Sequence, residues 1–195
     1  MQEIYLIKNQ PVPGGVEHMK KMKPVYLIII ILILMVIVTL QYRENEKIRT
    51  TQGTLVGSRI DSLQFQVESL SKYLSSTKIP EKEYLDRISG GFSEDMVMLP
   101  GTVSSGMLSV YIGMIRSDLD AMSSNIKYKE SEQELMATKQ LALDKITILL
   151  NELNYIMDNC KTDNIKYYQL SNPNDPIMKK VSKEMLDYLN NNDIH

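Results

Sequence analysis

The sequence predicts an all-α protein with one N-terminal transmembrane helix, followed by an antiparallel helical bundle or coiled-coil-like hairpin. The first observation is the run VYLIIIILILMVIVTL at residues 25–40, which contains no charged residue, no glycine and no proline. The second is that later segments repeat apolar residues at alternating spacings of three and four. That period is typical of long helices that pack against one another at shallow angles.

The apolar run is slightly short for a membrane span. Its sixteen residues cover roughly 24 Å as a helix, against a hydrocarbon core of about 30 Å. Adding Pro24, Gln41 and Tyr42 gives a span over residues 24–42 of roughly 28 Å, and flanking Lys and Arg side chains can snorkel over the remaining mismatch. Lipid favours a helix here because the backbone must satisfy its own hydrogen bonds. Four residues spaced along the predicted span are Val25, Ile30, Met35 and Leu40.

A cleaved secretory signal is the main alternative to an anchor. Lys20, Lys21 and Lys23 stand before the run, and a basic start followed by an apolar stretch is also the signal-peptide pattern. Signal h-regions are usually about 7–15 residues long and lead into small residues at the cleavage site. The run here leads into VTLQYRE, without an Ala-x-Ala-like pair. An uncleaved signal anchor is therefore favoured over a secreted helical protein.

The charges that flank the run do not decide its orientation by count. Four Lys or Arg residues lie on each side within about twenty residues, which is a tie under the positive-inside rule. Tight packing of the lysines against the N-terminal end favours a cytosolic tail over residues 1–23, and long C-terminal domains cross largely regardless of charge. Residues 43–195 are thus expected outside the cytosol. Residues 1–18 are either a flexible tail or untranslated, because Met1 and Met19 both remain candidate starts.

The first helix of the extracytoplasmic domain is predicted over residues 43–78. Its apolar residues follow a 4-3-4-3-4 spacing that places them on one face. Pro80 ends this element, and a short helix is predicted over 80–88. The stripe consists of Val56, Ile60, Leu63, Val67, Leu70 and Leu74.

Two further stripes predict helices over residues 103–128 and 131–158. Ser131 with Glu134 has the form of a capping box, which favours a new helix beginning there. One continuous helix over 103–158 fits the periodicity equally well. The first of these stripes consists of Leu108, Ile112, Ile115, Leu119, Met122 and Ile126, and the second of Leu143, Ile146, Leu150, Leu153 and Met157.

The last helix is predicted over residues 176–190. Asp175 and Pro176 are a good N-cap and N1 pair, and the polar run NNND ends the element. Its apolar residues are Ile177, Val181, Met185, Leu186 and Leu189.

Residues 89–106, SGGFSEDMVMLPGTVSSG, are predicted to interrupt the helices as a loop. They contain four of the nine glycines, and loops of this length inside a compact domain are uncommon and often functional. A flap over the bundle is the favoured interpretation of this segment, and an element that contacts a partner or ligand is the alternative. The expected contact residues are Phe92, Met96, Met98 and Leu99.

Gly53 and Gly57 form a GxxxG pattern. In a membrane span this pattern brings two helices together. Here it lies beyond the predicted span. Close packing, or local weakening, within the first exposed helix is therefore the favoured interpretation.

Composition and motifs exclude several function classes. Residues 41–195 carry 18 Lys and Arg against 22 Asp and Glu, which argues against a nucleic-acid partner because such a surface needs a basic stripe. Cys160 is the only cysteine, and His18 and His195 lie on opposite sides of the predicted anchor. No Walker loop, nucleophile elbow or EF-hand series is present. We therefore expect no catalytic residue, no metal ligand and no cofactor, and the chain is predicted not to be an enzyme.

The remaining expectation is a single-pass protein of a bacterial cell membrane. Its helical domain would act as a protein-interaction or scaffold module of the envelope, with the lipid bilayer and either another envelope protein or a second copy as partners. The alternative is a sensor-type ligand-binding bundle. In layout only, the chain resembles the periplasmic four-helix bundles of chemoreceptors and sensor kinases, and this resemblance carries over no residue.

Overall fold

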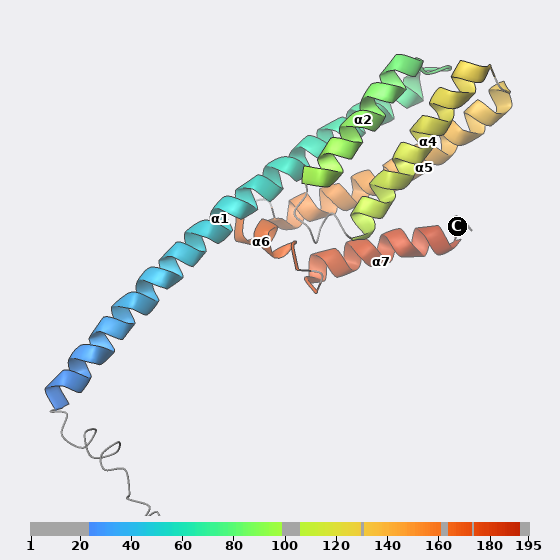
Figure 1. Ribbon diagram of the computed structural model, residues 1–195. Helices are drawn as coiled ribbons and strands as arrows, with labels where there is room; N and C mark the ends of the chain where they lie inside the picture. Colours follow the sequence, from blue (N-terminus) through green and yellow to red (C-terminus); the bar gives the residue numbers. More distant parts are fainter. Residues whose placement is uncertain (1–23, 99–105, 130, 161–163, 173, 192–195) are drawn as a thin grey trace, which may run out of the picture. The chain divides into compact units, whose positions relative to one another are not determined.

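The computed structural model describes residues 24–98, 106–129, 131–160, 164–172 and 174–191 (Figure 1). Over these residues the chain forms helices and no strand, which confirms the all-α prediction. The chain divides into two units, Met1–Glu46 and Lys47–His195. The helices are α1 (Pro24–Ser76), α2 (Lys82–Met98), α4 (Met107–Tyr128), α5 (Glu132–Cys160), α6 (Asn164–Gln169) and α7 (Pro176–Asn191).

The described part of the first unit is the N-terminal portion of α1. Every large apolar side chain at positions 25–40 is at least 43% exposed, and none of the most apolar stretch is buried. The Thr39 hydroxyl donates a hydrogen bond to the Met35 carbonyl oxygen, at 2.7 Å, so this polar group is satisfied within the helix. The segment is long and apolar enough to cross a membrane.

The helix α1 is a single element, although two adjoining helices were predicted with a boundary at residue 42. No glycine or proline occurs between Pro24 and Gly53, and these are the residues that most strongly break helices. All six residues of the predicted stripe are at most 3% exposed, from Val56 to Leu74. The periodicity therefore identified the face of α1 that forms core.

The second unit is a helical bundle with one hydrophobic core. The helix α2 packs against α4, α4 packs against α5 and α7, and α5 packs against α6 and α7. Short connections join α1 to α2 and α4 to α5, as in antiparallel helical hairpins. The stripe of α4 is buried as predicted from Leu108 to Met122, while Ile126 is half-buried.

The chain breaks between α4 and α5, which settles the open question of one helix or two. Lys129 adopts the left-handed conformation, with φ of 53° and ψ of 44°, and its N–H donates to the carbonyl oxygens of Asn125 and Ile126. The Ser131 hydroxyl then accepts a hydrogen bond from the Gln133 N–H at 3.2 Å. The C-cap of α4, Lys129, is therefore followed two positions later by the N-cap of α5, Ser131.

The predicted start of the last helix is also confirmed. The Asp175 carboxylate accepts a hydrogen bond from the Ile177 N–H at 2.9 Å. The helix α7 buries Met178, Val181 and Met185. Leu186, which was assigned to its stripe, is instead 46% exposed.

The predicted loop at residues 89–106 is wrong in its first part, because α2 continues to Met98. Phe92 is completely buried in the core, and the Ser89 hydroxyl donates to an Asp120 carboxylate oxygen at 2.6 Å. Tertiary packing against α4 thus outweighs the weak helix propensity of Gly90 and Gly91, which costs about 1 kcal/mol per glycine.

The buried face of α5 is rotated relative to the predicted stripe. Ile146 and Leu153 are buried as expected, but Leu143, Leu150 and Met157 are only half-buried. Since α5 packs against α4, α6 and α7, its buried face is wide and includes polar positions that periodicity does not reveal. The buried residues are Leu135, Lys139, Ala142, Lys145, Ile146, Leu149, Glu152, Leu153, Ile156 and Cys160.

Candidate functional site

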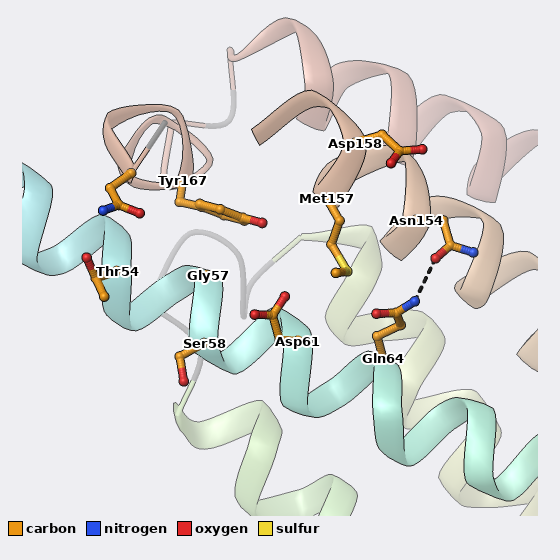
Figure 2. A pocket seen from close by; sticks show the side chains of 10 residues that line it. Thr54, Gly57, Ser58, Asp61, Gln64, Asn154, Met157, Asp158 and Tyr167 are labelled. Atoms are coloured by element: carbon orange, nitrogen blue, oxygen red, sulfur yellow. Dashed lines mark hydrogen bonds between the residues drawn. The ribbon is translucent and has the colours of Figure 1, made fainter. Parts of the chain in front are cut away.

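A cleft of about 610 Å³ lies within the bundle, where α1, α5 and α6 meet (Figure 2). Most of the residues that line it are of polar type. The lining residues are Thr54, Gly57, Ser58, Asp61 and Gln64 of α1, Asn154, Met157 and Asp158 of α5, and Asn164 and Tyr167 of α6.

Two glycines allow α6 to approach α1 at this cleft. A methyl group on Gly53 would lie 1.6 Å from the Asn164 carbonyl oxygen. One on Gly57 would lie 3.1 Å from the Tyr167 ring. The GxxxG pattern therefore serves close packing inside the bundle, the interpretation that the sequence favoured.

Tyr167 forms one end of the cleft. Its side chain is 8% exposed, its ring packs over Gly57, and its hydroxyl points into the space between α1 and α5 (Figure 2). Burial raises the pKa of this hydroxyl, and the nearby Asp61 carboxylate and Cys160 thiol raise it further. Tyr167 is thus a neutral phenol at physiological pH.

An amide pair forms the other end of the cleft. The Gln64 side-chain nitrogen donates to the Asn154 side-chain oxygen at 2.7 Å (Figure 2). It also donates to a Glu68 carboxylate oxygen at 3.0 Å. Both of its protons are then used. The Gln64 carbonyl oxygen and the Asn154 amino group remain able to bind a ligand.

The cleft is negatively charged. Asp61 and Asp158 lie on the α1 and α5 sides, both exposed, and neither belongs to an ion pair of the described residues. The described residues also contain no group of three or more His, Cys, Asp or Glu side chains placed to hold a metal ion. Carboxylates, amides and a phenol in a cleft can bind a ligand through hydrogen bonds and charge.

A second group of polar side chains is buried where α4, α5 and α7 pack together. The Lys145 ammonium lies 2.7 Å from the Asp118 carboxylate, yet burial outweighs this contact and raises the pKa of Asp118. Glu152 is 3% exposed, and one of its oxygens has no hydrogen-bond partner. Burial and the neighbouring Glu184 carboxyl raise the pKa of Glu152 to about 7. We interpret this group as structural, because the cleft does not include it.

The residues that the sequence singled out do not form this cleft. Phe92 is in the core. The backbones of Met96 and Met98 lie in α2, but their side chains, like all of Leu99, fall outside the described residues. Their partner contact stays a prediction. Val25, Ile30, Met35 and Leu40 lie exposed on α1, in the first unit.

The cleft itself was missed by the sequence analysis. Its wall at Tyr167 belongs to α6, which has only six residues, too few to show a helical period. No helix was therefore predicted between residues 158 and 176. The available signal was the pair Gly53 and Gly57, because two small residues four apart mark a place where another backbone can approach.

No protein-family model, no curated protein and no solved structure matches this chain. Its function is therefore inferred from the residues and contacts described above.

Proposed function

We propose that this chain is a single-pass protein of the cell membrane whose helical bundle lies outside the cytosol and acts as an interaction or scaffold module of the envelope. The observation that supports this proposal is the division within one helix, Pro24–Ser76. Its N-terminal part is apolar on every face and exposed along its whole length, whereas its C-terminal part buries a single stripe. A helix that is apolar all round needs an apolar environment.

The continuity of α1 supports a retained anchor over a cleaved signal. The helix passes without a break through the residues after the apolar run, where a signal peptide would present small residues to its peptidase. Expression of the full chain in a bacterium tests this directly. We expect a protein of intact mass that stays in the membrane pellet after alkaline carbonate extraction. A shortened protein in the soluble periplasmic fraction would support the secreted alternative instead.

The orientation requires an introduced cysteine, because Cys160 is completely buried. We choose Asn151→Cys, at an exposed position of α5. A membrane-impermeant maleimide should label this variant in intact spheroplasts, while the parent protein, with only Cys160, should stay unlabelled. Labelling of Asn151→Cys only after lysis would place the bundle in the cytosol and reverse the proposed topology.

The interaction role is supported by large apolar side chains on the outside of the bundle. Leu55 and Phe65 of α1 are 60% and 73% exposed, and aromatic side chains such as that of Phe65 are enriched where proteins meet. A photo-crosslinking residue at position 65 should give a discrete adduct in membranes, and one at Lys183, an exposed residue of α7, should not. An adduct of twice the mass identifies a second copy, another discrete mass identifies an envelope partner, and no adduct contradicts an interface at Phe65.

A second candidate function, a sensor-type ligand-binding bundle, is favoured by the polar cleft at Asp61 and Tyr167. A small molecule that raises the melting temperature of the bundle would support this function. Crosslinking at Phe65 without any such stabilisation would favour the scaffold role.

A further inference from the structure

The Tyr167 side chain is mostly buried, and its hydroxyl opens into the cleft without a partner among the described residues. The side chain is 8% exposed, its hydroxyl points into the cleft (Figure 2), and it makes no hydrogen bond within the described part of the chain. A hydroxyl that opens into a cleft and has no protein partner can donate a hydrogen bond to, or accept one from, a ligand or water. This observation is independent of the charges that line the cleft.

The charges indicate what kind of ligand fits. Asp61 and Asp158 are the charged residues of the lining, and both are negative. An anionic ligand would face two carboxylates with no lining cation to offset their repulsion. A cation with several N–H donors complements the carboxylates, the Gln64 carbonyl oxygen and the Tyr167 hydroxyl, all of which can accept hydrogen bonds.

The dimensions of the cleft favour an organic cation over a metal ion. A volume of about 610 Å³ falls in the range of small-molecule sites, roughly 300–1,000 Å³. A calcium ion takes about six to eight oxygen ligands at short distance, and the described residues hold no metal-binding group of three or more candidate side chains.

We propose that the cleft binds a protonated amine or guanidinium group, with Asp61 and Asp158 as its charge partners and the Tyr167 hydroxyl as a positioning group. The same chemistry has two sources, a free polyamine-like molecule or a Lys or Arg side chain of a peptide. The inference rests on the ligand-binding candidate function above and does not depend on membrane anchoring.

The test uses the full chain purified in detergent micelles and isothermal titration calorimetry. The probes are putrescine and a short peptide with one internal lysine, and the neutral control is the same peptide with norleucine at that position. We expect saturable binding of at least one cationic probe and none of the neutral peptide. Tighter binding of putrescine identifies a free amine as the ligand, and tighter binding of the lysine peptide identifies a peptide.

Substitutions within the cleft, compared with one outside it, test whether the cationic probes bind there. Asp61→Asn and Asp158→Asn should each weaken binding about tenfold, since each removes a charge-assisted hydrogen bond. Tyr167→Phe should weaken it about threefold, as expected for a neutral hydrogen bond. Asp187→Asn, on the exposed surface of α7, should bind like the parent protein, and the melting temperature of each variant without ligand verifies folding.

Two results would overturn the proposal. One is that neither cationic probe binds more tightly than the norleucine peptide. The other is that a folded Asp61→Asn protein binds like the parent, or that Asp187→Asn loses as much affinity as Asp61→Asn, because binding would then be unspecific. Neither result bears on the carbonate extraction, so anchoring and amine binding can fail separately.

Discussion

The two parts of α1 differ in how their apolar side chains are accommodated, although they belong to one helix. Ile30 and Leu34 are 43% and 54% exposed, whereas Ile60 and Leu70 are completely buried. In the C-terminal part, apolar residues form one stripe that neighbouring helices cover. In the N-terminal part, they surround the helix, and neighbours on one side cannot cover them all. The comparison shows that the angular spread of apolar residues, and not their number, decides whether neighbouring helices can bury them.

Polar groups are satisfied within a single helix in both parts of the chain, but the bundle also satisfies them between helices. In the apolar segment the Thr39 hydroxyl is satisfied by the carbonyl oxygen of its own helix. In the bundle, Lys145 is satisfied by Asp118 on another helix. Glu152 has a buried oxygen without a hydrogen-bond partner. A helix in lipid must satisfy its polar groups internally, whereas a bundle can satisfy them between helices and can also leave one unsatisfied.

The largest expected effect is on membrane association, which depends on the N-terminal part of α1 and not on the bundle. Replacing Ile30 and Leu34 together by Arg should abolish membrane association, because each arginine near the centre of a span costs about 2.5–3.5 kcal/mol. The melting temperature of the bundle should not change, since these side chains lie outside its core. Carbonate extraction and circular dichroism measure the two outcomes, with Ile30→Ala plus Leu34→Ala as the control. A variant that stays in the membrane would contradict the proposed span.

The next largest effect tests the close approach of α6 to the C-terminal part of α1. Gly53→Ala should destabilise the bundle by about 3 kcal/mol, because the added methyl group would meet the Asn164 carbonyl oxygen at 1.6 Å and overpacking of this kind costs about 1–3 kcal/mol or more. Gly113→Ala in α4 is the matched control, because nothing lies within 4 Å of its added methyl group. It should stabilise the bundle by about 0.5–1 kcal/mol. Urea unfolding measures both, and equal signs would refute the packing role of Gly53.

A third prediction concerns the buried carboxyl of the bundle. The pKa of Glu152 in the folded protein is about 7, above the value of about 4.3 for an unperturbed glutamate. The folded state therefore holds this proton more tightly, and stability falls as the pH rises from about 4 to 7. Three side chains face this carboxyl group: Glu184 and Lys180 of α7 and Tyr111 of α4. The positive charge of Lys180 lowers the pKa of Glu152 and so limits the loss of stability.

Glu152→Gln removes this titration. The variant should be about 3 kcal/mol more stable than the parent at pH 8 and nearly equal to it at pH 4. Thermal unfolding across this range measures the difference. A constant difference at all pH values would show that Glu152 does not titrate in the window.

The smallest predicted effect is local to the junction of α4 and α5. Lys129 has a φ of 53°, a conformation that costs a non-glycine residue about 1 kcal/mol. Lys129→Gly should therefore raise the stability of the bundle by about 1 kcal/mol. Ser117→Gly, at an exposed position within α4, should lower it by about 0.5 kcal/mol. Destabilisation by Lys129→Gly in urea unfolding would contradict the capping role of this residue.

Much of the fold was predictable from local patterns, and the failures have physical causes. The stripe from Val56 to Leu74 was correct because a single buried face gives a strong helical period. The extent of α2 was missed because Gly90 and Gly91 indicate a break, while the burial of Phe92 against other helices keeps the segment helical. The cleft was missed because its walls come from three separate helices.

The sequence by itself determined the all-helical class, the apolar N-terminal segment and the stripe of α1 that forms core, because each depends on residues within a few turns of one another. Only the tertiary structure decided which face of α5 is buried and that residues 164–169 form the helix α6. It decided as well that Gly53 and Gly57 allow α6 to pack closely against α1. It also decided that Asp61 and Asp158 line one cleft with Tyr167. These features depend on contacts between separate helices, such as Gly53 with Asn164 and Lys145 with Asp118. No local period records such contacts.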